Sequence, residues 1–430
     1  MFGFFSRKKK EKASDAPKAQ PVICARADHC ISRKNIDPDA LRVLYRLSDF
    51  GYAAYLVGGG VRDLLLGRKP KDFDVGTSAT PNEVKRVFRN CFLIGRRFRL
   101  AHIRFRDKVI ETATFRAASQ SVGEIIEHAA EGPLEDNTYG TPETDAYRRD
   151  FTVNGLFYDI KTFAVIDYVG GLKDLKAGII RSIGDPMIRF REDPVRMMRA
   201  IKFSSRLGFA IEKKTDEAIR ALHGCILTAA PPRVCEEVFR LFTYGVGTAA
   251  FRMMYGYGLL RDLLPDLAAF IDSDGGEKSR TWDYMAMLDR YEKAMHERGI
   301  DVSNGLRAAV LYTAMARVKG SREAVGTMLR SLQTPRHVYF SATFMIDSVK
   351  RFASPPAHGR GRILARRDFP DALDYNRIVA RTEGRGEETL DEWANLYNRQ
   401  NEEQEQELEQ ERSEEGHHHE RRRKKERNRP

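Results

Sequence analysis

The chain has 430 residues, of which 42% are hydrophobic and 10% aromatic, so it can bury a substantial core over about two to four domains. Lys and Arg outnumber Asp and Glu by 73 to 61, and the net charge of +12 favours a polyanionic partner, either nucleic acid or an anionic membrane surface. No apolar run approaches the roughly 18 to 20 residues of a membrane-spanning helix, which excludes an integral helical membrane protein.

The cysteines are odd in number and contain no CxxC pair, which indicates reduced thiols and a cytoplasmic protein. They are Cys24, Cys30, Cys91, Cys225 and Cys235. Two of them flank His29, but no second pair of ligands follows at the spacing of a zinc finger. We therefore favour ordinary thiols over a zinc site.

The first segment, residues 1–21, is rich in Lys, Ala and Ser and poor in large apolar side chains, which predicts a disordered basic arm. Residues 1–10 place three phenylalanines before a basic run, without the apolar core and cleavage site of a signal peptide. A weak contact of residues 1–10 with a membrane surface or with RNA is the alternative to an arm without contacts.

Residues 22–185 have a mixed pattern that predicts an α+β domain. A strand at 52–57 should lead through three glycines into a short helix at 61–66, and 73–75 should lie in a second strand. Thr80, Pro81 and Glu83 have the arrangement of a helix start with a capping box. Further strands are expected at 92–94, 101–105 and 109–115.

The remaining segments differ in character. Residues 116–147 are polar, contain Gly and Pro and lack a clear period, which predicts a long excursion without regular elements. After Asp193-Pro194 the apolar spacing predicts helices throughout, beginning with 195–207 and continuing with one that starts at Pro231. We divide this part into a helical neck at 186–245 and a helical body at 246–400. Residues 401–430 are first Glu- and Gln-rich and then basic, as in a charged low-complexity tail.

Asp72 and Asp74 are the first candidates for chemistry, because side chains two apart on a strand point to the same face. Two neighbouring carboxylates repel each other, and a divalent cation removes that conflict. Mg²⁺ prefers carboxylate and water oxygens, and two-metal phosphoryl transfer places two ions between such groups. We therefore expect Asp72 and Asp74 to bind two Mg²⁺ ions, although the pair alone is also found in ordinary strands and turns.

The upstream sequence strengthens this expectation. Gly58, Gly59 and Gly60 follow an apolar strand and precede a helix, where backbone N–H groups can approach phosphate oxygens. Arg62 supplies a bidentate donor for a phosphate or hydroxyl. We expect Gly58, Gly59 and Arg62 to bind a nucleotide, with a plain tight turn as the alternative for the glycines. The GxxxxGK[ST] pattern is absent, which excludes a Walker loop.

Here the chain resembles a known class. LVGGGVRD at 56–63 and KPKDFDV at 69–75 are similar to the head of the polymerase-beta-type nucleotidyltransferases, in particular the bacterial class of poly(A) polymerases and CCA-adding tRNA nucleotidyltransferases. ETATFR at 111–116, RRDFTVNGL at 148–156 and REDPVRMMRA at 191–200 match the same class in the same order. The resemblance runs from about 22 to 208. It implies a head at 22–185 followed by the all-helical neck and an RNA-binding body.

Two residues compete to complete the metal site. Glu111 belongs to a strand that could neighbour the strand of Asp72, with a salt bridge to Arg116 as the alternative role. Asp150 lies in a block that the resemblance places at the site, where Arg149 could also neutralise triphosphate oxygens. We favour Asp150 and keep Glu111 open.

Asp193 and Arg196 are candidates for base selection, because residues at i and i+3 share one face of a helix. A carboxylate accepts from an exocyclic amine while a guanidinium donates to a ring nitrogen, a pattern that adenine and cytosine present and guanine and uracil do not. The resemblance implies the same role, with Arg199 behind this face; a surface ion pair is the alternative. Lys202 stands where many relatives carry Arg, so a bidentate contact is not expected there.

The base-reading pair accepts both A and C. The block at 93–102 resembles the stretch that distinguishes poly(A) polymerases from CCA-adding relatives, and basic chain ends suit an enzyme that holds many RNAs by their phosphates. We therefore expect template-independent addition of AMP from ATP to RNA 3′ ends, with no DNA specificity. CCA addition to tRNA is the alternative. A non-catalytic RNA-binding protein is less favoured, since it predicts a lost carboxylate or a broken glycine loop.

Overall fold

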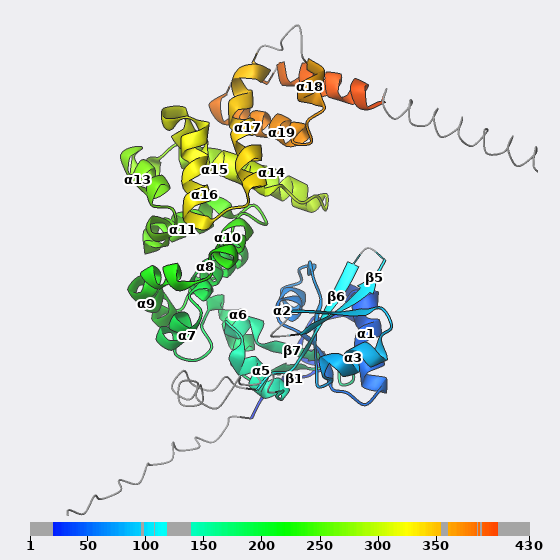
Figure 1. Cartoon of the computed structure of the whole chain (residues 1–430). Coiled ribbons are helices and arrows are strands. Elements are labelled where there is room, and N and C mark those ends of the chain that lie inside the picture. Colours follow the sequence, from blue (N-terminus) through cyan, green and yellow to red (C-terminus); the bar gives the residue numbers. More distant parts are fainter. Residues whose placement is uncertain are drawn as a thin grey trace, which may run out of the picture. The chain divides into compact units, whose positions relative to one another are not determined.

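The computed structural model describes residues 20–95, 99–106, 108–117, 139–353, 360–384, 386–387 and 389–402 (Figure 1). The chain divides into two compact units. The first contains the residues up to 189 together with 210–215, and the second contains 190–209 and the residues from 216 onward. The arm at 1–10 and the tail from 403 lie outside the described residues. In the described part of the chain, no helix is long and apolar enough to cross a membrane.

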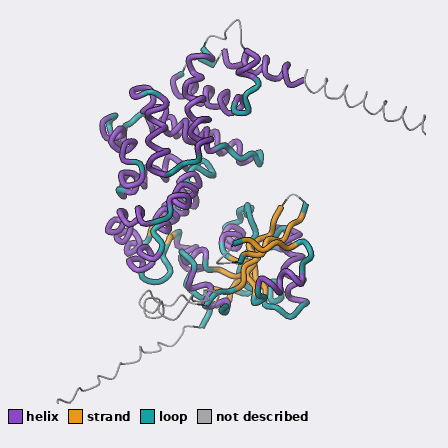
Figure 2. Tube along the Cα trace, in the orientation of Figure 1, coloured by secondary structure: helices purple, strands orange, loops and turns teal. Residues whose placement is uncertain are grey.

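An eight-stranded mixed sheet forms the centre of the first unit (Figure 2). Its order is β1-β8-β7-β2-β3-β6-β5-β4, and β3 and β6 are its parallel neighbours. The strands are β1 Val22–Cys24, β2 Ala54–Val57, β3 Asp74–Thr77, β4 Cys91–Ile94, β5 Leu100–Phe105, β6 Lys108–Thr114, β7 Leu156–Asp159 and β8 Val165–Asp167. A separate short parallel pair joins β9 Ile179–Ile180 to β10 Ala210–Ile211.

The two faces of the sheet are covered differently. On one face, α1 (Pro38–Asp49), α2 (Gly59–Leu65) and α3 (Pro81–Val87) pack against inward-pointing strand residues in the main core of this unit. On the other face a smaller cluster is built around Val57, Phe115 and Phe157, and α5 (Pro142–Arg148) adds Ala146 to it. The second face is therefore covered mainly over β2, β7 and β8.

Local sequence signals account for the helix starts. The Asp37 carboxylate accepts hydrogen bonds from two backbone N–H groups at the start of α1, where Pro38 occupies the first turn. Thr80 and Glu83 form the reciprocal capping box at the start of α3, which confirms that prediction. In a third case, α6 (Gly171–Ala177) follows a turn in which the Asp167 carboxylate accepts from four successive N–H groups.

The second unit is helical, as predicted. Its helices, two of which begin in the first unit, are α7 Pro186–Glu192, α8 Val195–Leu207, α9 Lys213–Leu222, α10 Pro231–Arg240, α11 Gly247–Tyr257, α12 Leu259–Leu263, α13 Pro265–Ser273, α14 Thr281–Glu297, α15 Asn304–Lys319, α16 Ser321–Leu332, α17 Arg336–Phe352, α18 Arg360–Leu364 and α19 Phe369–Glu383. α15 is buried from Gly305 to Ala316 and packs against α14, α16, α17 and α19. A buried ion pair from Arg307 Nε to Glu292 Oε1 (2.6 Å) joins it to α14.

Several expectations need correction. The excursion at 116–147 contains a helix, α5, which Thr141 and Thr144 open with a capping box and Pro142 starts; residues 118–138 lie outside the described residues. The region after residue 193 is not purely helical, because β10 lies within it. The first compact unit contains the residues up to 189 together with 210–215, and the expected end of the head at 185 stays a prediction. The division of the helical part into neck and body at 245 stays a prediction.

Candidate active site

The strand register brings the candidate carboxylates together. β3 pairs in parallel with β6, and Val75 lies opposite Thr112, so the preceding residues Asp74 and Glu111 are neighbours across the two strands. Asp72 precedes β3, which begins at Asp74, so the two aspartates do not both lie within the strand as expected. Asp74 is partly buried, and the side chain of Glu111 is half exposed. The alternative role of Glu111 was an ion pair with Arg116; the structure places His102 Nε2 3.8 Å from Glu111 Oε1.

Asp74 is the most strongly perturbed of these carboxyls. Burial, together with the negative charges of Glu111 and Asp72, raises its pKa to about 6, and Arg149 opposes this shift. A carboxylate that is desolvated and repelled by two neighbours is unfavourable in a purely structural role. The arrangement therefore suits a site that binds a cation.

The glycine loop packs directly against this cluster. Gly58 has φ +71° and ψ −133°, and a Cβ there would lie 2.8 Å from Nη1 of Arg149. A side chain at Gly60 would contact the backbone oxygen of Asp72 at 3.4 Å. Glycine is therefore favoured at residue 58 by its positive φ and by the close approach of Arg149, whereas at residue 60 a side chain would make only ordinary contacts. Both contacts bring the loop to the carboxylates and to Arg149.

Arg62 was expected to contact a phosphate or hydroxyl, but its side chain is buried. Its side chain is only 1% exposed, and its guanidinium donates to Asp63 Oδ1 (2.9 and 2.7 Å) and to Asn154 Oδ1 (2.5 Å). Asn154 in turn donates to Asp150 Oδ1 at 3.0 Å. This hydrogen-bond network connects the glycine loop to the 148–156 block. Sequence reasoning missed Asp63 and Asn154, although both lie inside the motif blocks.

Asp150 is part of that network. Its Oδ1 also accepts from the backbone N–H of Phe151 at 2.8 Å. The neighbours that perturb the pKa of Asp74 include Glu111, Asp72 and Arg149. The hydrogen bonds of Asp150 connect it to the loop, while Glu111 adds to the pKa shift of Asp74. Which of the two completes the metal site stays a prediction.

Arg149 lies where it can serve both the loop and the carboxylates. It forms an ion pair with Asp145 of α5 (3.0 Å), and its guanidinium lies 5.4 Å from the ring centroid of Phe157. Its side chain keeps a quarter of its surface exposed. The unexpected helix α5 thus fixes the orientation of an arginine beside Gly58 and Asp74.

In the second unit, Asp193 and Arg196 are neighbours, but not as expected. Pro194 ends α7 at Glu192, because the residue before a proline is disfavoured in helices and proline has no N–H to continue the ladder. Asp193 lies in the break, and its Oδ2 is 3.8 Å from Arg196 Nε and 2.6 Å from Arg233 Nη2. Its Oδ1 is buried without a hydrogen-bond partner among the described residues. Arg233 was not anticipated.

Arg199 and Lys202 of α8 contact groups other than Asp193 and Arg196. The Arg199 guanidinium lies 5.3 Å from the Phe203 ring centroid. Lys202 forms an ion pair with Glu237, and burial lowers the pKa of Lys202 to about 8, with Arg199 adding to the effect and Glu237 opposing it. Lys202 therefore has a structural partner, while Arg199 backs the helix that carries Arg196.

The fit of Mg²⁺ to these residues can be judged from the donor set. In the part of the chain that the structure describes, no group of three His, Cys, Asp or Glu side chains is already arranged around one point. Mg²⁺ is commonly held by one or two carboxylates, waters and substrate phosphates, so Asp72, Asp74 and Glu111 fit it as a site completed by a nucleotide. His29 differs, because Nε2 contacts the Phe163 carbonyl and Nδ1 accepts from Ile31 N–H.

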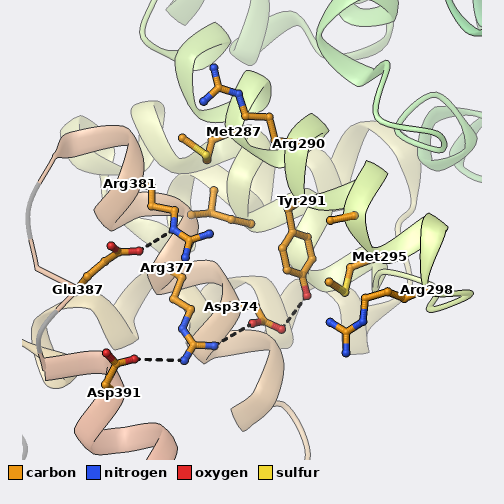
Figure 3. Close-up of a pocket in the computed structure, with 12 residues that line it drawn as sticks. Met287, Arg290, Tyr291, Met295, Arg298, Asp374, Arg377, Arg381, Glu387 and Asp391 are labelled. Carbon is orange, nitrogen blue, oxygen red and sulfur yellow. Dashed lines mark hydrogen bonds and ion pairs between the residues drawn. The ribbon is translucent and has the colours of Figure 1, made fainter.

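A separate cleft of about 660 Å³ lies between α14 and α19 (Figure 3). Several of its charged side chains pair with one another: Arg377 with Asp374 and Asp391, and Arg381 with Glu387. Tyr291 donates to Asp374 at 2.7 Å. Arg290 and Arg298 are exposed at the cleft and have no ion pair recorded among the described residues. This chemistry suits binding of an anion rather than catalysis.

The block at 93–102, which carried the choice between AMP and CCA addition, is described only in part. Leu93 and Ile94 end β4, Leu100 begins β5, and residues 96–98 lie outside the described residues. That choice is therefore untested by the geometry.

Three family models and a solved structure are similar to this chain and indicate its class. The family model "Poly A polymerase head domain" matches residues 54–181. Two more match 208–271, "Probable RNA and SrmB-binding site of polymerase A", and 311–429, "Polymerase A arginine-rich C-terminus". The crystal structure of the Bacillus stearothermophilus CCA-adding enzyme in complex with CTP aligns with a TM-score of 0.63 and 26% identity, over 85% of this chain and 82% of that one.

Two relatives called poly(A) polymerase I are similar in sequence. The one from Haemophilus influenzae is 34% identical over 418 residues, 92% of each chain. The one from Escherichia coli O6:H1 is 46% identical over 274 residues, which is 63% of this chain and 59% of that relative, so less than two thirds of its length is matched.

The mixed sheet followed by helices is the fold of the polymerase-beta-type nucleotidyltransferases, which confirms the expected fold class. The chain belongs to the poly(A) polymerase family.

The crowding around Asp74 predicts how a neutral substitution changes stability. Because the folded pKa of about 6 exceeds the ordinary 3.8, the folded state binds more protons, so its stability falls as pH rises through this window. Without divalent cations at pH 7.5, Asp74→Asn should raise the free energy of unfolding by about 1 to 3 kcal/mol. Chemical denaturation measures this change.

The same experiment with Mg²⁺ supplies the second half of the test. Added Mg²⁺ should stabilise the unsubstituted chain more than the Asp74→Asn variant, because binding to the folded state adds to its stability. Asp49→Asn, an exposed substitution at the end of α1, is the matched control and should change neither value. A less stable Asp74→Asn variant in the absence of metal would contradict the crowding argument.

Proposed function

We propose that this chain adds AMP from ATP to RNA 3′ ends without a template. The observation that carries the proposal is the desolvated Asp74 carboxylate, which lies beside Glu111 and Asp72, under a glycine loop and next to Arg149. Phosphoryl transfer needs such a combination of anionic metal ligands and groups that accept a triphosphate.

The residues divide into three roles. Asp72, Asp74 and Glu111 would hold two Mg²⁺ ions, which when bound lower the pKa of the attacking hydroxyl and neutralise the leaving phosphates. Arg149 and the backbone of Gly58 and Gly59 would orient the triphosphate. In the reaction, the RNA 3′ hydroxyl loses its proton and its oxygen forms a bond to the α-phosphorus. The bond from the α-phosphorus to the oxygen that bridges it to the β-phosphorus breaks, and pyrophosphate leaves.

We assign Glu111 rather than Asp150 as the third ligand. Glu111 neighbours Asp74 across parallel strands and adds to the shift of its pKa, whereas Asp150 accepts hydrogen bonds from Asn154 and Phe151. Asp150 and Arg62 would then act as positioning residues. They would hold the glycine loop in the position that triphosphate binding requires.

Asp193 is proposed to read the base with Arg196. Its Oδ1 is a buried acceptor without a partner among the described residues, and its Oδ2 is fixed by Arg233. A buried acceptor of this kind gains from an exocyclic amine, which adenine and cytosine carry at the required position. Guanine and uracil would place an oxygen against the carboxylate and be rejected.

RNA contact in the second unit is proposed for the cleft between α14 and α19. Arg290 and Arg298 lie on one helix, eight residues and about 12 Å apart. Two guanidinium groups at this spacing can contact two phosphates of one strand without reading its sequence. The ion pairs of Arg377 with Asp374 and Asp391 stabilise the cleft that Arg290 and Arg298 line.

CCA addition remains the second candidate, because the aligned solved structure is a CCA-adding enzyme. The sequence relatives called poly(A) polymerase I, one of them matched over nearly its full length, favour AMP addition. Asp193 and Arg196 suit both. The choice needs an assay that offers both nucleotides and both kinds of RNA.

Extension of two RNAs tests the activity. The purified chain with Mg²⁺ should add repeated A residues to a generic oligonucleotide and to a tRNA without its CCA end, and should add little C to either. Asp72→Ala and Asp74→Ala should each lower the rate on the order of 10³-fold, because the metal site supplies several kcal/mol of transition-state stabilisation. Asp49→Ala should retain the rate.

Two further variants separate the competing ligands. Glu111→Gln should lower kcat as Asp74→Ala does, whereas Asp150→Asn should act mainly by raising the KM for ATP. Efficient C addition confined to the tRNA would overturn AMP addition as the activity. Retained turnover in Asp74→Ala would overturn the site.

Nucleotide competition tests the reading of the base. In Asp193→Ala, the ratio of kcat/KM for ATP to that for GTP should fall about 10- to 100-fold, as expected from loss of a charged hydrogen bond. Glu192→Gln changes the adjacent residue, whose Oε2 lies 3.7 Å from Arg196, and should keep the ratio. Equal loss in both variants would indicate a local structural effect and count against base reading.

Salt dependence of RNA binding tests the cleft. The Arg290→Ala/Arg298→Ala double variant should bind a generic single-stranded RNA more weakly, with the slope of log K against log salt reduced by about 1.4, or 0.7 for each lost phosphate contact. Lys319→Ala/Arg322→Ala removes two exposed cations elsewhere in the second unit and is the control. An unchanged slope in the cleft variant would contradict RNA binding there.

A further inference from the structure

The sheet face that carries the carboxylates continues beyond them. Along β6, Ile110 points into the main core, so Glu111 and Val109 point to the opposite face. The same alternation along β5 places His102 and Arg104 on that face, since Ala101 and Ile103 are core residues. Along β4, Cys91 belongs to the core and Phe92 and Ile94 do not. These side chains share one face with Asp74 and Glu111.

The register sets their distance from the reaction centre. His102 lies opposite Glu111, and Phe92 lies opposite His102, so Phe92 is two strands away from Glu111 in the same row. At the usual spacing between strands this is roughly 10 Å. A terminal nucleotide whose 3′ oxygen lies at the carboxylates is therefore close enough to reach this row with its base or with the base before it.

This part of the face is apolar and open. Phe92 is 54% exposed, Ile94 51% and Val109 40%, and β4 is the edge strand of the sheet. The guanidinium of Arg104 lies 5.2 Å from the centroid of the Phe92 ring. A group of exposed apolar side chains with a cation beside its aromatic ring marks an interaction surface.

The other half of the same face is not open. Over β2 and β7 it is covered by the cluster of Val57, Phe115 and Phe157, with Ala146 of α5 packed against them. Among the described residues, the carboxylates thus lie at the border between a half of this face that the cluster covers and a half that it does not cover. The second half adjoins Glu111 through His102 on β5.

We propose that Phe92, Ile94, Arg104 and Val109 form the surface on which the 3′-terminal bases of the acceptor RNA stack, here called the acceptor face. This assignment rests on the proposed function, which requires an RNA 3′ hydroxyl at the carboxylates. The Phe92 ring and its apolar neighbours offer a stacking platform that accepts any base, and Arg104 adds a cation for the strand. Phe92 and Arg104 bind and position the acceptor; they do not take part in the chemistry.

A protein strand that pairs with the edge of β4 is the competing occupant, because exposed edges accept added strands. Two observations favour RNA. The acceptor face is continuous with the carboxylates through His102 and Glu111, and its charged member is a cation. An added strand would instead use the backbone of β4 and would not depend on the Phe92 ring.

A fluorescent RNA tests the surface independently of catalysis. An oligonucleotide with 2-aminopurine at its 3′ end should be quenched when it binds the full chain, because its terminal base stacks. Phe92→Ala and Arg104→Ala should reduce this quenching and raise the KM for the RNA about tenfold, with the KM for ATP unchanged. Phe92→Tyr should restore both values.

Phe50→Ala is the matched control. Phe50 is 59% exposed and has the Arg46 guanidinium 5.8 Å from its ring centroid, but it lies at the end of α1, which packs on the other face of the sheet. This variant should behave as the unsubstituted chain. Thermal unfolding of each variant confirms that an exposed substitution leaves the fold intact.

The outcomes separate the two proposals. If the unsubstituted chain extends RNA while Phe92→Ala quenches normally and keeps its KM, the acceptor face is wrong and the proposed function stands. If the unsubstituted chain adds no nucleotide, the proposed function fails, and the quenching experiment alone still decides the surface. Loss of quenching in Phe50→Ala as well would overturn the assignment to this face.

Discussion

The arrangement of the first unit depends on one unfavourable interaction, the repulsion among the carboxylates around Asp74. Parallel pairing of β3 with β6 places Glu111 beside Asp74, and burial makes the charged form costly enough to raise the pKa to about 6. A fold selected for stability alone would replace one of these groups. Keeping them requires neighbours that hold the strands in place, and the charge of Arg149 partly offsets the repulsion.

The support for this cluster comes from a buried hydrogen-bond network that joins distant parts of the sequence. Arg62 contacts Asn154, 92 residues further along the chain, and Asn154 contacts Asp150. The glycine loop and the RRDFTVNGL block therefore form one structural element. A buried guanidinium is stable only when its donors are satisfied, so loss of Asn154 would leave Nη1 of Arg62 without its acceptor, although the ion pair with Asp63 remains, and would weaken the link between the loop and the 148–156 block.

Sequence reasoning succeeded where the signal is local and failed where it depends on register. The capping box at Thr80, strands β2 to β6 and the helix from Pro231 follow from short patterns, whereas β1, β7 and β8 were not predicted. Whether Glu111 or Asp150 adjoins Asp74 depends on how β6 aligns with β3, and no periodicity encodes that alignment. The buried position of Arg62 was missed for a related reason, since its partner lies far away in sequence. The helix break at Asp193 was not predicted either, although Pro194 is a local signal for it.

The surfaces proposed for RNA differ in chemistry from the residues proposed for the nucleotide. Asp193 offers a single buried acceptor, whose satisfaction depends on the identity of the base. The acceptor face offers aromatic and aliphatic side chains, and the α14–α19 cleft offers exposed guanidinium groups, neither of which distinguishes one RNA sequence from another. Selectivity is thus concentrated on the group being added. Such a division suits repeated addition, because each product ends in a base that stacks as well as the previous one did.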